Sequence, residues 1–179
     1  MSPLHVQAHL LLLLLLASSI SSRATILEDA CKYVAGDNKD IVSYDYCIKF
    51  FQGDKGSATA DKFSLAIIAA NITRVAAKNI SKRIATLQAS VKGILIQRCL
   101  DYCASEYSQT ADDLGIAMHD TALGPAQDLW TAKSKLIAAA DSPDKCEAVF
   151  GDVNQTSLLS AENSEFVKKA VIALLVNPS

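Results

Sequence analysis

Residues 58–92 run without a glycine or a proline, and their apolar side chains recur every three or four residues. One such series is Ala76, Ile80, Ile84, Leu87 and Val91. This spacing is the period of an α-helix that turns one face toward a core. Thr59 is expected to cap the start of the helix. Because a helix of this length must bury its apolar face, the pattern predicts a helical protein with a packed core.

Three more helices are expected after the first. Residues 95–122 carry the series Ile96, Leu100, Cys103, Tyr107, Ala111, Leu114 and Met118. A third helix is expected to begin at Gly124-Pro125 and to end at Ser142-Pro143, and a fourth to begin near Ser160. No stretch alternates as a half-buried strand does. The pattern predicts an all-α, antiparallel up-and-down four-helix bundle over residues 58–179, extended by an N-terminal helical hairpin over residues 25–57.

The N-terminus has the pattern of a targeting signal. Leu10 to Leu16 is an unbroken leucine run, and small residues follow it up to Ala24. The run is too short to span a membrane, which takes about 20 apolar residues. It has the size of the apolar core of a secretory signal peptide. We therefore expect residues 1–24 to be removed, and residues 25–179 to form a secreted domain without a membrane segment.

Secretion decides how the cysteines are interpreted. They are Cys31, Cys47, Cys99, Cys103 and Cys146. In an oxidising compartment disulfides are the default, but an odd number leaves one thiol free or paired between chains. Spacing alone leaves the pairing open. A metal site is disfavoured because no CxxC pair is present and His119 is the only histidine after the signal.

Three N-x-S/T sequons are candidate glycosylation sites in a secreted chain. Asn154 lies in a turn-like stretch and is the first choice. Asn71 and Asn79 lie within the first long predicted helix.

Candidate catalytic residues are few. His119 lies 20 and 16 residues from Cys99 and Cys103 along one predicted helix, too far for a nucleophile and its base. The carboxylates of Asp112-Asp113 and Glu162/Glu165 fit a solvated surface, and Trp130 fits the core or the bundle edge, with a sugar platform as the lesser alternative. The net charge of -2 and the 6% aromatic content disfavour a nucleic-acid surface. We expect a non-enzyme without a cofactor.

An ordered set of short motifs gives the chain a family resemblance. The motifs are residues 30–35 (ACKYVA), 42–47 (VSYDYC), Ala60-Asp61, L-x-x-C-x-x-x-Y at 100–107, C-E-x-x-F at 146–150 and S-L-L-S-x-x-N at 157–163. Together they resemble the plant invertase/pectin methylesterase inhibitor family, and within it the pollen-allergen branch described as invertase inhibitors. The resemblance covers residues 26–176. Leu158 departs from it, because the family usually has proline there.

The resemblance implies a helical hairpin on a four-helix bundle, with disulfides Cys31–Cys47 and Cys103–Cys146. Cys99 stands where the family usually has a small residue. We expect it to be a free, partly buried thiol in a monomeric protein. The alternatives are disulfide exchange with Cys103 and a covalent dimer through Cys99.

The resemblance also implies a non-catalytic protein that occludes the substrate cleft of a cell-wall carbohydrate-acting enzyme in the apoplast. Pectin methylesterase is the first expected target, and cell-wall or vacuolar invertase is the second. A secreted helical interaction module without inhibitory activity is the alternative from another class. The candidate interface lies on the second long helix, opposite its core series, and consists of Arg98, Asp101, Ser105, Gln109 and Asp112.

Overall fold

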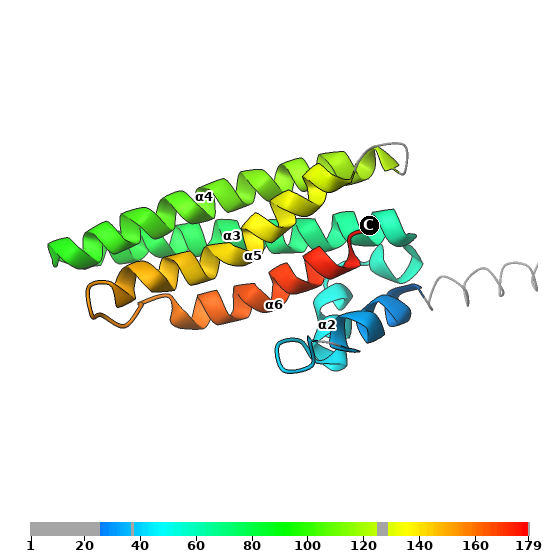
Figure 1. The fold of residues 1–179 in the computed structure, drawn as a ribbon, viewed down its shortest axis with the longest axis horizontal. Coiled ribbons are helices and arrows are strands. Elements are labelled where there is room, and N and C mark those ends of the chain that lie inside the picture. Colours follow the sequence, from blue (N-terminus) through cyan, green and yellow to red (C-terminus); the bar gives the residue numbers. More distant parts are fainter. Residues whose placement is uncertain (1–25, 37, 125–128, 179) are drawn as a thin grey trace, which may run out of the picture.

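The computed structural model describes residues 26–36, 38–124 and 129–178, and the regular elements in these ranges are all helical. They are helical residues 26–36, α2 (Tyr44–Gln52), the short 3-10 helix η1 (Ser57–Thr59), α3 (Lys62–Ser90), α4 (Ile94–Ala122), α5 (Trp130–Gly151) and α6 (Ser160–Val176) (Figure 1). The expected all-α bundle with an N-terminal hairpin is confirmed. The predicted signal peptide, residues 1–24, lies outside the described residues.

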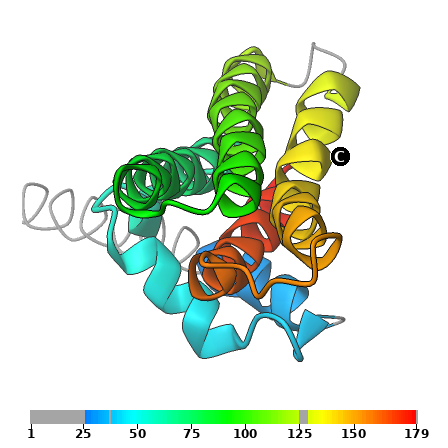
Figure 2. The same cartoon turned by 90° about the vertical axis from the view of Figure 1, so that its left-hand side faces the viewer.

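The four long helices pack in a ring. Each contacts its neighbours in chain order, and α6 closes the ring against α3. Figure 2 looks along the bundle and shows the four helices around one core, with the hairpin beneath α6. Alanines such as Ala69, Ala77, Ala139 and Ala173 are buried between the helices. Their small side chains let the helix backbones approach closely.

Large side chains fill the centre of the bundle. Tyr107, Phe150 and Phe166 are fully buried, and the rings of Tyr107 and Phe166 meet edge to face at 5.3 Å between centroids. Leu100 and Leu136 pack in the same core. Each such side chain contributes about 1.5–3 kcal/mol by leaving water.

Two predicted helix ends are wrong. Thr59 lies in η1, and α3 is capped by Asp61, whose Oδ1 accepts a hydrogen bond from the Ser64 amide at 2.8 Å. Pro143 does not end α5, which continues to Gly151. A proline inside a helix costs about 3 kcal/mol, because the carbonyl four residues earlier loses its donor. The buried Cys146 and Phe150 beyond Pro143 keep the chain helical.

The buried side chains of the hairpin are continuous with the core of the bundle. Cys31 and Cys47 form a disulfide with 5.5 Å between their Cα atoms, and Phe51 is buried beside them. Ser43 caps α2 by accepting a hydrogen bond from the Tyr46 amide at 3.2 Å. The sequence therefore forms two short helices that are stabilised by a covalent link.

A hydrogen bond links the hairpin to α6 of the bundle. The Tyr46 hydroxyl donates to Oε1 of Glu165 on α6 at 2.5 Å, and Lys169 lies 3.0 Å from the same oxygen. Burial acts to raise the pKa of Glu165, but the hydrogen bonds from Tyr46 and Lys169 and the charges of Lys169 and Lys168 outweigh it and hold that pKa below its usual value. Glu165 is therefore a carboxylate that ties the hairpin to α6.

Candidate functional site

The outward face of α4 is exposed along its whole length. Its members follow one another at alternating spacings of three and four residues, which places them on one side of the helix. They are Leu95, Arg98, Tyr102, Ser105, Gln109, Asp112, Ile116, His119 and Leu123, and all are exposed. We call this set the outer α4 row. At 1.5 Å per residue it is about 42 Å long.

The structure brings the predicted interface residues together on this face. Arg98, Ser105, Gln109 and Asp112 are in the outer α4 row, and Asp101 is exposed beside it. Sequence reasoning missed the apolar members, which are Leu95, Tyr102, Ile116 and Leu123, at spacings of 7, 14 and 7 residues. Tyr102 and Ile116 are each 41% exposed, and Leu95 and Leu123 each 51%. The signal was available as a second apolar period in residues 94–123, opposite the buried one.

The polar members of the outer α4 row offer both charges to a partner. Arg98 and Asp112 form no ion pair with another described residue. Gln109 donates through Nε2 to Oδ1 of the buried Asp113 at 3.1 Å, and this hydrogen bond fixes the orientation of the Gln109 amide. Asp101 accepts from Gln88 of α3 at 2.7 Å. The row therefore presents a cation (Arg98), an anion (Asp112) and an oriented amide (Gln109).

Contacts beneath α4 hold this face in place. Cys103 is bonded to Cys146 of α5, and Asp113 forms an ion pair with Lys135 of α5 at 2.9 Å. On the other side, Nε of Arg74 on α3 donates to the Ala111 carbonyl at 2.9 Å. The Arg74 side chain passes over Gly115, where an added Cβ would be in van der Waals contact with its guanidinium carbon at 3.4 Å. A partner would therefore meet a preorganised surface, which lowers the ordering entropy lost on binding.

A polar cluster, buried at Tyr107 and Asn163, joins α4, α5 and α6. The Tyr107 hydroxyl donates to Oδ1 of Asn163 at 2.7 Å, and Nδ2 of Asn163 donates to Glu147 at 2.5 Å. Ser160 donates to the other oxygen of Glu147 at 3.0 Å. Burial, then the charges of Glu147 and Glu162, raise the pKa of Tyr107 well above its usual value. Tyr107, Glu147 and Asn163 come from three separate sequence motifs that meet in this one cluster.

A family model described as plant invertase/pectin methylesterase inhibitor matches residues 25–176. The chain belongs to this family. A Platanus acerifolia protein named "Putative invertase inhibitor" is 30% identical over 166 residues, covering 92% of this chain and 89% of that protein. An Arabidopsis thaliana "Cell wall / vacuolar inhibitor of fructosidase 2" is 30% identical over 136 residues, covering 75% and 70% of the two chains.

A solved structure shares the fold of this inhibitor-family chain. The crystal structure of a pectin methylesterase inhibitor from Arabidopsis thaliana superposes with a TM-score of 0.57, covering 87% of this chain and 98% of that one. At 18% sequence identity the likeness shows the fold alone.

The cysteines of this family member pair as the resemblance implied. The structure confirms Cys31–Cys47 and Cys103–Cys146. Cys99 is a free thiol, and it is more deeply buried than expected. Its Sγ lies 3.2 Å from the Val149 carbonyl of α5, to which it donates. Burial is the main cause that raises the pKa of Cys99, and the charge of Asp152 adds to it.

The other ionisable candidates have structural surroundings. His119 is exposed beside Asp120, and Asp112 is solvated as expected, but Asp113 is buried in its ion pair with Lys135. Glu162 lies 3.4 Å from Arg83. In the part of the chain that the structure describes, no group of three or more His, Cys, Asp or Glu side chains is placed to hold a metal ion.

The sequon asparagines are open to solvent. Asn71 and Asn79 are exposed on α3, and Asn154 is exposed in the turn after α5 with a φ of 54°. Their glycosylation stays a prediction. None of the helices in the described ranges is long and apolar enough to cross a membrane.

Proposed function

We propose that this chain is a non-catalytic protein inhibitor that lays the outer α4 row over the substrate cleft of a carbohydrate-acting enzyme. The family match over residues 25–176 carries the proposal. The names of the relatives support it, since they are called inhibitors of invertase and of fructosidase. The preorganised face of α4 supports the choice of surface.

The outer α4 row suits a cleft with apolar rims and a polar floor. Tyr102 and Ile116 are 14 residues apart, which corresponds to about 21 Å along the helix. Between them lie Ser105, Gln109 and Asp112, whose polar groups match the donors and acceptors of a sugar-binding cleft. A stable interface hides about 800 Å² on each partner, and a few large side chains carry most of its binding energy. Tyr102 and Ile116 are therefore the proposed anchors.

Pectin methylesterase and invertase are the two candidate targets. Pectin methylesterase is the first target that the sequence resemblance implies, and the fold shared with a pectin methylesterase inhibitor is compatible with that target. The second is favoured by the names of the relatives, which include a second "Putative invertase inhibitor", from Platanus orientalis, at 27% identity over 154 residues.

The same proposal includes the place where the protein acts. The leucine run and the small residues after it support removal of residues 1–24 and secretion to the apoplast or cell wall. The Arabidopsis relative is named for the cell wall and the vacuole, so the vacuole is the second candidate compartment. We further propose that the mature protein is a monomer.

The deciding experiment titrates the purified, oxidised protein against pectin methylesterase and invertase. We expect saturable inhibition of one of them. Y102A and I116A should each weaken it at least about tenfold, as expected for anchor residues. V75A is the matched control, because Val75 is an exposed apolar residue of α3. Inhibition of neither enzyme would support the interaction module instead. Full inhibition by the Y102A/I116A double variant would place the contact on another face.

A further inference from the structure

A cleft opens where the hairpin meets the bundle. It has a volume of about 480 Å³ and is lined by residues of the hairpin, the start of α3, α5 and the end of α6. Tyr33, Ile137, Leu175 and Pro178 form much of its apolar wall. Its volume is within the range of ligand clefts, about 300–1,000 Å³. We call it the hairpin cleft.

The hairpin cleft carries positive charge. Lys62 and Lys133 line it, and no Asp or Glu side chain is among its described lining residues. Neither lysine forms an ion pair with a described carboxylate, although the Lys62 ammonium lies 5.1 Å from the centroid of the Phe63 ring. The cleft is therefore complementary to a ligand that bears carboxylates.

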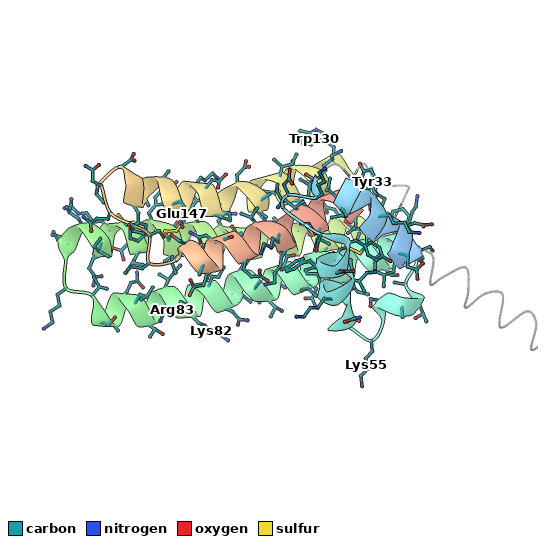
Figure 3. The ribbon with its side chains drawn as sticks, turned by 90° about the horizontal axis from the view of Figure 1, so that it is seen from below. Tyr33, Lys55, Lys82, Arg83, Trp130 and Glu147 are labelled. Carbon is teal, nitrogen blue, oxygen red and sulfur yellow. A yellow bond between two sulfur atoms is a disulfide. The ribbon has the colours of Figure 1, made fainter. Side chains whose placement is uncertain are left out.

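Two aromatic side chains are strongly exposed at this end of the molecule. Tyr33 is 64% exposed and lines the cleft, and Trp130 is 71% exposed. Trp130 precedes Lys133 by three residues and Ile137 by seven, so the three share one face of α5. Figure 3 shows Trp130 and Tyr33 at the hairpin end, away from Lys82 and Arg83 in the middle of α3.

We propose that the hairpin cleft binds an acidic oligosaccharide made of uronate units. The C–H face of a sugar ring packs on an aromatic ring, whose π face is negative. Each ring of a uronate chain also carries a carboxylate, which the compact ammonium groups of Lys62 and Lys133 attract. Exposed aromatic rings beside lysines favour this ligand over an acidic peptide, which would use the charges but not the ring faces.

This site is separate from the outer α4 row. Figures 1 and 2 both show the hairpin on the α6 side of the bundle, away from α4. An oligosaccharide in the hairpin cleft therefore leaves the proposed inhibitory face free. The protein would be held on an acidic polysaccharide while α4 contacts an enzyme, and the proposal does not depend on which enzyme that is.

The test titrates the secreted, oxidised protein with a de-esterified oligogalacturonate of about ten units. Trp130 is the single tryptophan of the chain, so its fluorescence reports on the face of α5 that also carries Lys133 and Ile137. The same oligomer with its carboxyls methyl-esterified measures the part played by charge. Polyglutamate of matched charge represents an acidic polypeptide. Calorimetry at low and high salt gives the affinities.

K62E/K133E should bind the oligogalacturonate at least tenfold more weakly, and Y33A should also weaken binding. The matched control is K55E/K82E, which makes the same change of charge on exposed lysines outside the cleft (Figure 3). Both cleft lysines lie near the starts of their helices, where glutamate is well tolerated. Affinity should fall as salt rises, since exposed charges are screened. Equal affinities of K62E/K133E and K55E/K82E would overturn the proposal. Binding of polyglutamate as tight as that of the uronate would overturn it in favour of an acidic polypeptide.

Discussion

Replacing Tyr107 with phenylalanine should destabilise the bundle while leaving its shape unchanged. The hydroxyl donates to Oδ1 of Asn163 at 2.7 Å, and Asn163 is only 2% exposed. Without the hydroxyl, this amide oxygen is left buried and without that donor. An unsatisfied buried polar atom costs about 1–3 kcal/mol. For a protein of this size the Tm should fall by about 2–12 °C.

Thermal and urea unfolding of the oxidised protein, followed by circular dichroism, measure this loss. Y102F is the matched control, because Tyr102 is a tyrosine on the same helix with an exposed side chain. It should change the free energy of unfolding by less than about 0.5 kcal/mol, as most surface substitutions do. If Y107F were as stable as Y102F, the cluster of Tyr107, Asn163 and Glu147 would not hold α4 to α6 as argued.

Three further predictions concern the cysteines and Glu165. The Cys103–Cys146 disulfide closes a loop of 43 residues, so in the chain-entropy model C103A/C146A should lower the free energy of unfolding by about 4 kcal/mol. The Cys31–Cys47 disulfide closes a loop of 16 residues, so C31A/C47A should lower it by about 3 kcal/mol and leave the bundle helical. A larger loss from the hairpin pair, in urea titrations of both variants, would refute this. Because the pKa of Glu165 is lowered, its stabilising link is complete above the ordinary glutamate pKa and is lost as pH falls through the lowered one. The protection factors for hydrogen exchange over residues 26–52, which compare each measured rate with the intrinsic rate at the same pH, should therefore fall in acid, and those of E165Q should be low at neutral pH as well; equal protection factors in acid and at neutral pH would contradict it. Cys99 is buried and its pKa is raised. Iodoacetamide should therefore alkylate it at least about tenfold more slowly in the native protein than in urea, as measured by mass spectrometry. Equal rates of alkylation would exclude a buried thiol.

The fold followed from the sequence because helical periodicity is a local signal. The starts of α4 and α6 were expected within one residue of where they lie. The helix end predicted at Pro143 is wrong because the local preference of proline to end a helix is outweighed by the burial of Cys146 and Phe150, which is a tertiary effect. Thr59 and Asp61 are both good capping residues, and only the 3-10 turn between them decides which one caps α3.

The candidate site was predicted in part. Arg98, Ser105, Gln109 and Asp112 could be placed on one face because that face is defined by the buried series opposite to it. Tyr102 and Ile116 were missed because an exposed apolar residue looks like a core residue until the packing is known. The hydrogen bonds of Tyr107, Asn163 and Glu147 join residues up to 56 positions apart, which no spacing rule within one helix can indicate.

Cys99 and Cys103 lie one turn apart on α4, so which of them bonds to Cys146 depends on how α4 and α5 are aligned along their length. Cys103 is bonded to Cys146, while Cys99, one turn earlier, faces the carbonyl of Val149. If α5 slid along α4 by one turn, about 5.4 Å, Cys99 would stand opposite Cys146 instead. A chain oxidised in that slipped arrangement would be covalently held with the core side chains of α5 one turn away from their native partners on α4. Oxidative folding of this protein therefore includes a choice between two thiols for one partner, and the protein made in a cell that lacks disulfide isomerase should contain both isomers.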